Sequence, residues 1–251
     1  MDKTNCSLYQ QARFREAAGA EFRPGGLALT EELAEACALQ PGDSVLDLGC
    51  GVGSTASFLA REFGVSMIGL DSSPRFIQEA QARDPQVRWV IGSSQEIPFP
   101  NCHFDVVFSE CFLSGFDDAG SVLQEIRRVL RPRGRLAVTD MYLRAPSNDR
   151  PVHLAPAATC LRGAVGKDET LEHFALSGFV VRIWRDRSDA LTALMASLIF
   201  AYGSAASFWE AAGAGRGVQE ALRAERPGYY LLVAQPNADD HGIDPREARR
   251  G

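Results

Sequence analysis

A glycine-rich turn is the segment whose spacing is most specific for ligand binding. Residues 45–53 read VLDLGCGVG, so a short apolar run passes directly into a turn with glycines at positions 49, 51 and 53. Glycine permits positive φ angles and a close approach of the backbone to a ligand. The third glycine comes one residue too early for the Gly-x-Gly-x-x-Gly dinucleotide fingerprint. The turn therefore predicts a ligand site and disfavours an NAD-dependent oxidoreductase.

Two carboxylates accompany this turn. Asp47 lies inside the apolar run, where a buried carboxylate needs a partner. We expect it to order the turn and, through the turn, the amino group of an amino-acid ligand; the alternative is that Asp47 only caps the turn and Gly51 only packs. Asp71 closes the next apolar run, at residues 67–71. A carboxylate at that place can hold the two hydroxyl groups of a ribose.

A carboxylate and a thiol follow the apolar run at 104–109. Glu110 is a candidate general base or cofactor contact, and a solvent-exposed loop carboxylate is an equal alternative. Cys111 comes next, and Cys160 lies in a later insertion. A single cysteine is more often an inert core residue, whereas paired thiolates suit a soft centre. The six cysteines form no CxxC pair, so we expect no metal site. His153 is a second candidate base.

The elements that would position these residues alternate along the chain. Short apolar runs and amphipathic segments follow one another, which predicts a parallel sheet covered by helices on both faces. In such sheets ligands bind at the carboxyl ends of the strands, near the point where strand order reverses. The predicted strands are 44–48, 66–70, 87–91, 104–109, 135–141, 179–184 and 229–234, and the predicted helices are 55–63, 74–83, 120–130, 168–176 and a stretch within 188–224.

Two regions flank this predicted core. We expect one α/β ligand-binding domain at residues 41–235, preceded by a helical cap at 1–40. A helical insertion at about 186–226 contains aromatic residues that could cover a pocket and exclude water. Residues 236–251 are polar and charged, and we predict that they are disordered.

Composition argues against several classes of function. The chain has 251 residues and a formal net charge of −6, which disfavours nucleic-acid and anionic-membrane partners. The arginines between 127 and 135 are expected at a helix end and in the turn after it. The sequence starts without an apolar signal segment and has no run of ~20 apolar residues that could span a membrane. We therefore predict a cytoplasmic protein with mostly free thiols.

Over roughly residues 41–142 the sequence resembles the class I S-adenosylmethionine-dependent methyltransferases. The resemblance implies a Rossmann-like, doubly wound, mostly parallel sheet of seven strands. It also implies S-adenosylmethionine as the cofactor and a small molecule as the substrate. The segments that carry it are VLDLGCGVG at 45–53, GLDSS at 69–73, GSSQEIPF at 92–99, FDVVFSE at 104–110 and VLRPRGRLAVTD at 129–140.

The same resemblance assigns the cofactor contacts. The glycine turn would lie against the methionine moiety, Asp71 would hold the ribose, and the segment after the third strand would cover the adenine. Ser93 stands where the family usually has an Asp that accepts a hydrogen bond from the adenine amino group. Ser93 itself, more weakly, or Gln95 would take that place. The residues assigned to the cofactor are Asp47, Gly49, Gly51, Gly53, Asp71, Ser72, Ser94, Gln95 and Ser109.

The cysteines carry a narrower resemblance, to the arsenite methyltransferases. The matching segments are SEC at 109–111, TCLRGA at 159–164 and LEHFALSGF at 171–179. It implies that Cys111 and Cys160 bind arsenic as thiolates. The further cysteine that this family carries in a Tyr-Gly-Cys segment has no counterpart here, and Glu110 stands where an asparagine is usual.

Three functional hypotheses remain open at this point. The first is an S-adenosylmethionine-dependent methyltransferase of a small molecule such as a thiol or arsenite, with Cys111, Cys160 and Glu110 as catalytic candidates. The second is an O-, N- or C-methyltransferase of a quinone or secondary metabolite. The third is a non-catalytic, thiol-rich binding protein on the same scaffold. Turnover with a substrate separates the first two hypotheses from the third.

Overall fold

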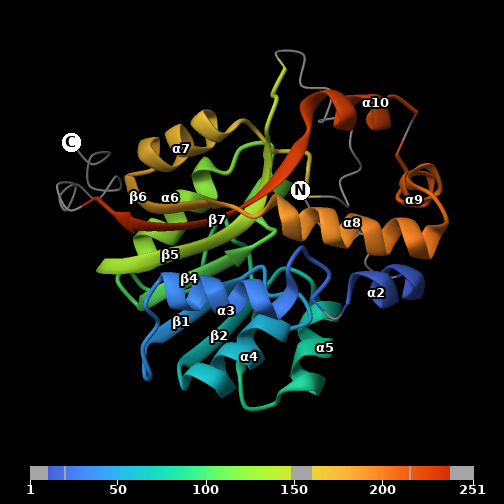
Figure 1. Ribbon diagram of the computed structural model, residues 1–251. Coiled ribbons are helices and arrows are strands. Elements are labelled where there is room, and N and C mark those ends of the chain that lie inside the picture. Colours follow the sequence, from blue (N-terminus) through green and yellow to red (C-terminus); the bar gives the residue numbers. More distant parts are fainter. Residues whose placement is uncertain (1–10, 20, 148–159, 215, 238–251) are drawn as a thin grey trace.

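The computed structural model contains one seven-stranded sheet in the order β3-β2-β1-β4-β5-β7-β6 (Figure 1). Strand β7 is antiparallel to β5 and β6, and the other pairs are parallel. The prediction of a doubly wound, mostly parallel sheet of seven strands is confirmed. The strands are β1 (Ser44–Leu48), β2 (Ser66–Asp71), β3 (Arg88–Ile91), β4 (Phe104–Glu110), β5 (Leu130–Leu143), β6 (Phe179–Asp186) and β7 (Pro227–Pro236).

The structure describes residues 11–19, 21–147, 160–214 and 216–237. His153, a candidate base, lies outside the described residues. The predicted disordered tail lies outside them as well, apart from Pro236 and Asn237.

Strand order reverses between β1 and β4. From this pair, β2 and β3 continue in one direction, and β5, β7 and β6 in the other. Chain connections leave the sheet in opposite directions at such a point, which opens a crevice at the carboxyl ends of the strands. Gly49 follows β1, Asp71 ends β2 and Glu110 ends β4. The fold therefore gathers residues from three predicted segments at one edge.

Helices cover both faces of the sheet (Figure 1). One buried apolar cluster contains residues of α3 and α4, and a second contains residues of α6 and α7. The two clusters lie on opposite faces because neighbouring residues of β1 and β4 alternate between them. The helices of this part of the chain are α3 (Gly26–Ala36), α4 (Ser54–Phe63), α5 (Pro74–Arg83), α6 (Gly120–Val129) and α7 (Lys167–Leu176).

The alternation of β4 decides which candidates share a face. Val106 and Phe108 belong to the cluster on the α3–α4 side, and Val107 belongs to the cluster on the α6–α7 side. By the same period of two, Glu110 faces the α3–α4 side and Ser109 faces the other.

Strand β5 is longer than predicted, because it begins at Leu130, directly after α6. Its pairing with β4 changes register between Phe104 and Val106. Such an irregularity tolerates Pro132, which has no N–H to donate, so the segment that we interpreted as a turn lies within the strand.

Local ion pairs neutralise part of the arginine cluster between residues 127 and 135. Arg128 pairs with Glu125, Arg131 with Asp105, and Arg135 with Asp43.

Three helices lie between β6 and β7 in the sequence: α8 (Ser188–Tyr202), α9 (Ala205–Ala211) and α10 (Arg216–Glu225). Helix α8 extends past the sheet and lies beside α2 (Ala12–Ala18) (Figure 1). The Arg13 guanidinium of α2 donates to the Ala201 carbonyl at 2.6 Å and lies over the Tyr202 ring. Among the described helices, none is by itself long and apolar enough to cross a membrane, and α8 with α9 meet those criteria only as a pair bent by 85°.

Candidate cofactor and acceptor site

The glycine turn after β1 is fixed by backbone hydrogen bonds. The N–H groups of Gly49 and Cys50 donate to the Leu70 carbonyl at 2.8 and 3.1 Å, which ties the turn to β2. Gly49 and Gly51 have φ angles of 77° and 52°, a region that favours glycine. A Cβ built on Gly51 would meet no protein atom within 4 Å. The turn therefore presents open space above Gly51, as a ligand-facing backbone requires.

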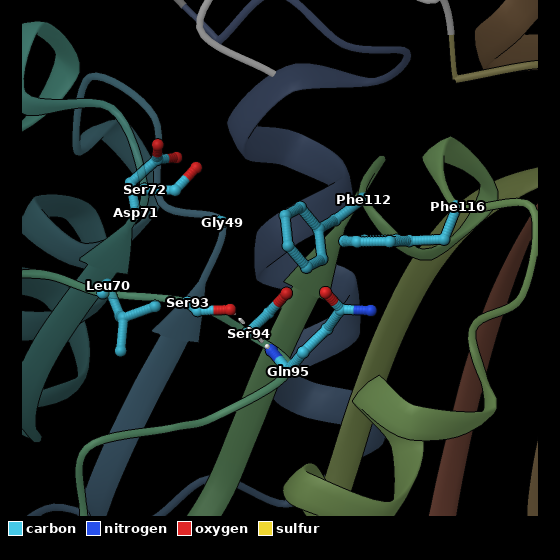
Figure 2. A pocket seen from close by; sticks show the side chains of 10 residues that line it. Gly49, Leu70, Asp71, Ser72, Ser93, Ser94, Gln95, Phe112 and Phe116 are labelled. Atoms are coloured by element: carbon cyan, nitrogen blue, oxygen red, sulfur yellow. Dashed lines mark hydrogen bonds between the residues drawn. The ribbon is translucent and has the colours of Figure 1, made fainter. Parts of the chain in front are cut away.

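Asp71 faces this open space and is oriented by two backbone groups. Its Oδ2 accepts from the Gly51 N–H at 3.0 Å and its Oδ1 accepts from the Ser73 N–H at 2.8 Å. A carboxylate has about four lone-pair sites, so acceptor capacity remains for a ligand. The adjoining cavity measures about 220 Å³ (Figure 2). Its lining residues are Gly49, Leu70, Asp71, Ser72, Gly92, Ser93, Ser94, Gln95, Phe112 and Phe116.

Asp47 lies beneath the turn with an incomplete set of partners. Its side chain is 3% exposed, and no hydrogen bond from the described residues reaches its Oδ2. Burial, and secondly the charge of Glu110, raises the pKa of Asp47 to about 8, although Arg23 opposes the shift. A buried carboxylate of this kind is stabilised by any cation that binds nearby.

Glu110 belongs to a buried ion pair beside Asp47. The Arg23 guanidinium lies 2.9 Å from its Oε2, and the two side chains are 6% and 4% exposed. The hydroxyl groups of Thr55 and Thr30 also donate to the Glu110 carboxylate, at 2.6 and 3.1 Å. With its oxygens bound by these groups, Glu110 is unsuited to the role of general base for an acceptor. The predicted solvent-exposed alternative is also wrong, because the side chain is buried.

Cys111 and Cys160 lie together although 49 residues separate them. The Cys160 thiol donates to the Cys111 carbonyl at 2.8 Å. A hydrogen bond between the two thiols, followed by burial, raises the pKa of Cys111 well above its usual value. Both residues are half-buried, and Cys111 directly precedes Phe112 of the cavity wall. The two cysteines that the sequence singled out therefore meet at the edge of the candidate site.

Comparison with known proteins identifies this constellation. Residues 46–138 match a family described as "Methyltransferase domain". The chain is 36% identical over 121 residues to 27-O-demethylrifamycin SV methyltransferase of Amycolatopsis mediterranei, covering 46% of this chain and 44% of that one. It is 37% identical over 113 residues to 2-phytyl-1,4-naphtoquinone methyltransferase of Synechococcus elongatus, covering 42% and 48%.

Residues 46–138 therefore form a methyltransferase domain. The chain spans about half the length of the curated relatives it matches. A solved structure of the [4+2]-cyclase SpnF is also similar, with a TM-score of 0.65 and 26% identity over 84% of this chain and 80% of that one. The fold likeness thus extends well beyond the segment that the family match covers.

The residues of the methyltransferase domain fit S-adenosylmethionine. Asp71 would hold the ribose, and Gly51 leaves room for a ligand against the backbone. The unpartnered Oδ2 of Asp47 could accept a hydrogen bond from an ammonium group, whose positive charge would lower the raised pKa of this carboxyl and favour its ionised form. Ser94 and Gln95 line the cavity where the adenine contacts were predicted. The Gln95 amide donates to Ser121 on α6 at 3.2 Å, which restricts its position.

Two residues assigned to the cofactor lie elsewhere in the methyltransferase domain. A Cβ on Gly53 would overlap the Trp89 ring, so this glycine serves close packing between the turn and β3. Ser109 is fully buried and faces the α6–α7 side, because it alternates with Phe108. Of the residues assigned to the cofactor, Asp47, Gly51, Gly53 and Ser109 are not among those lining the cavity.

Sequence reasoning missed an aromatic wall and the aspartate that supports it. Phe112 and Phe116 stand on the β4 side of the cavity, across from Asp71 and Ser72 (Figure 2). The Phe112 ring packs so closely on the turn that a Cβ on Gly49 would overlap it. Asp140 of β5 is fully buried and accepts from the Phe112 N–H at 3.1 Å. Two phenylalanines that follow strand β4, Phe112 and Phe116, were the feature of the sequence that could have predicted this wall.

Proposed function

We propose that this protein transfers a methyl group from S-adenosylmethionine to a small-molecule acceptor. The observation that carries the proposal is the cavity at the carboxyl ends of β1, β2 and β4, where the open face of Gly51 adjoins the oriented carboxylate of Asp71. The relatives named above methylate, by their names, a naphthoquinone and a rifamycin derivative. An organic acceptor of that general kind is the first version of the proposal.

Methyl transfer mainly requires the protein to position the acceptor next to the cofactor. When bound, the cofactor supplies a methyl group on a sulfonium, and the transfer is an in-line displacement. The protein has to hold the acceptor atom close to that methyl group and exclude water. Asp71 and Ser94 would orient the cofactor, and the rings of Phe112 and Phe116 would form an apolar wall. An oxygen or carbon acceptor also needs a base, and His153 stays a candidate for that role.

A second acceptor class is favoured by one specific observation, the 2.8 Å contact of the Cys160 thiol with the Cys111 carbonyl, which brings the two cysteines together. Two thiolates can bind a soft centre such as arsenic(III), whose lone pair then attacks the methyl group. Such an acceptor needs no general base. This version is consistent with the ion-paired state of Glu110, which keeps that carboxylate away from proton transfer.

A labelled-methyl transfer screen tests both versions. The panel would contain quinones, hydroxylated natural products, small thiols and arsenite. We expect transfer to one class, and loss of it in Asp71→Ala. If the acceptor is a quinone or an alcohol, Cys160→Ser should retain turnover; if it is arsenite, Cys160→Ser should abolish it while binding of S-adenosylhomocysteine persists. Cys102→Ser is the matched control, because Cys102 is exposed and outside the cavity. Tight cofactor binding without transfer to any class would favour the non-catalytic hypothesis.

A further inference from the structure

Residues 160–166 dock on the turn that follows β4 through a set of specific contacts. The Gly163 N–H donates to the Ser114 carbonyl at 2.8 Å, and the Ser114 hydroxyl donates to the Cys160 carbonyl at 2.6 Å. Arg162 forms an ion pair with Asp117 at 3.0 Å. A Cβ on Gly163 would overlap the Phe116 carbonyl oxygen. The backbone of residues 160–166 therefore packs directly against the backbone of the turn after β4, with no room for a side chain at Gly163.

The two thiols lie inside this docked contact. The Cys160 thiol donates to the Cys111 carbonyl at 2.8 Å and shares a hydrogen bond with the Cys111 thiol. Cys111 itself is held in a left-handed conformation, with a φ of 51°, and its N–H donates to the Thr139 carbonyl of β5 at 2.7 Å. The backbone on one side of the pair is thus anchored to the sheet. Among the described residues, Cys37 and Cys50 are buried and Cys102 is exposed.

We propose that Cys111 and Cys160 are a redox modification site that forms a reversible disulfide, fixing residues 160–166 to the end of β4. The inference rests on the 2.8 Å contact between the Cys160 sulfur and the Cys111 carbonyl and on the docked backbones around the two cysteines. It does not depend on the proposed methyl transfer. The co-reactant is a small-molecule disulfide, such as oxidised glutathione.

The reaction balances in two exchange steps. Cys160 loses its proton to solvent, and its sulfur attacks one sulfur of oxidised glutathione, forming a mixed disulfide and releasing one glutathione thiolate. Cys111 then loses its proton and attacks the Cys160 sulfur, which forms the internal disulfide and releases the second glutathione. The two cysteines are oxidised by two electrons, and the glutathione disulfide is reduced to two thiols.

The position of the pair links this modification to the cavity. Phe112 follows Cys111 directly, and its ring lies against Gly49 in the cavity wall. Phe116 contacts the Phe112 ring edge-on, with centroids 5.2 Å apart, and its backbone touches Gly163. A covalent bond between residues 111 and 160 would therefore restrain both aromatic residues of the wall through their own backbone.

Mass spectrometry of the 251-residue chain tests the proposal. Reduced protein is incubated with oxidised glutathione, remaining thiols are alkylated, and peptides are mapped. We expect one peptide linkage between Cys111 and Cys160, loss of the mass of two hydrogens, and reversal by dithiothreitol. In Cys111→Ser the reaction should stop at the first step, with one glutathione retained on Cys160. Cys102→Ser is the matched control and should keep the internal linkage.

Two results would overturn the inference. One is wild-type protein in which Cys111 and Cys160 remain alkylatable at glutathione concentrations that fully modify Cys102. The other is an internal disulfide that leaves amide hydrogen exchange of residues 160–166 unchanged, because a disulfide that fixes this segment must slow its exchange. The first measurement uses only the wild-type chain, so it stays decisive even if a variant folds poorly.

Discussion

The proposed cofactor half of the site, residues 45–110, and the proposed acceptor side, residues 111–117 with 160–166, are built by different means. In the cofactor half, backbone groups make the decisive contacts: Gly49 donates to Leu70, and Gly51 donates to Asp71. On the acceptor side, side chains join segments that are 46 and 49 residues apart, as in the contacts from Ser114 to Cys160 and from Cys160 to Cys111. A site made of local turns can be recognised from the spacing of residues in the sequence, whereas a site made of side chains that are distant in the sequence cannot.

The family match follows the same division. It covers residues 46–138 and therefore contains the cofactor half, but it ends before residues 160–166. We infer that the choice of acceptor depends on residues 111–117 and 160–166, because the second of these segments lies outside the family match.

The largest effect is expected at the Arg23–Glu110 ion pair. This pair is an exception to the contrast, because it supports the cofactor half through side chains. Arg23→Met would leave Glu110 buried without its cation. Removing one partner of a buried ion pair costs ~3–5 kcal/mol, so the free energy of unfolding should fall by that amount in a denaturant titration. The double variant Arg23→Met with Glu110→Gln should recover part of the loss. A change of ~1 kcal/mol or less, as for a surface pair, would contradict this account.

The Arg23–Glu110 pair also marks the limit of prediction from the sequence. Strand and helix positions followed from apolar periodicity, and the cofactor cavity followed from the glycine spacing and Asp71. Arg23 could not be found, because nothing local distinguishes an arginine that will be buried by a segment 87 positions away from one that stays in solvent. The surroundings of Gly53 and Ser109 could not be predicted for a related reason. Sequence spacing places them near the turn and the strand end, but the neighbour of Gly53 and the face of Ser109 depend on the tertiary packing.

The second prediction concerns affinity in the cofactor half. Asp71→Ala should weaken S-adenosylhomocysteine binding roughly ten- to a hundred-fold, because a charge-assisted hydrogen bond contributes ~1.5–3 kcal/mol. Titration calorimetry measures this directly. Asp84→Ala is the matched control: Asp84 also accepts a backbone N–H two residues onward, from Gln86 at 3.0 Å, but it does not line the cavity. Equal losses in both variants would indicate a general effect on folding.

The third prediction separates ligand contact from backbone strain. Gly51 and Gly42 have φ angles of 52° and 86°, and a Cβ on either would meet no protein atom within 4 Å. Replacing each by alanine should therefore cost a similar ~1–2 kcal/mol of stability, the penalty for a left-handed L-residue. Only Gly51→Ala should weaken S-adenosylhomocysteine binding, because Gly51 adjoins Asp71 in the proposed cofactor site and Gly42 does not. Unchanged affinity in that variant would show that the turn does not contact the cofactor.

The last prediction concerns the pH dependence that Asp47 gives to the cofactor half. Burial, then the charge of Glu110, raises its pKa to about 8, with Asp71 contributing and Arg23 opposing. An exposed aspartate releases its proton near about 4. The folded protein therefore holds this proton over a range in which the unfolded chain has lost it. Stability must fall as pH rises between those values.

Asp47→Asn keeps the shape of the side chain and removes its titration. The difference in the free energy of unfolding between this variant and the wild type should shift in favour of the variant as pH rises. The shift should be less than about 1.4 kcal/mol per pH unit, which is the limit for one proton. Asp105→Asn is the control with the opposite sign. The Ser44 N–H and Arg131 outweigh burial and lower the pKa of Asp105, so its carboxylate is ionised in both states throughout this range. Denaturant titrations at several pH values would contradict the prediction if Asp47→Asn and the wild type gave parallel curves.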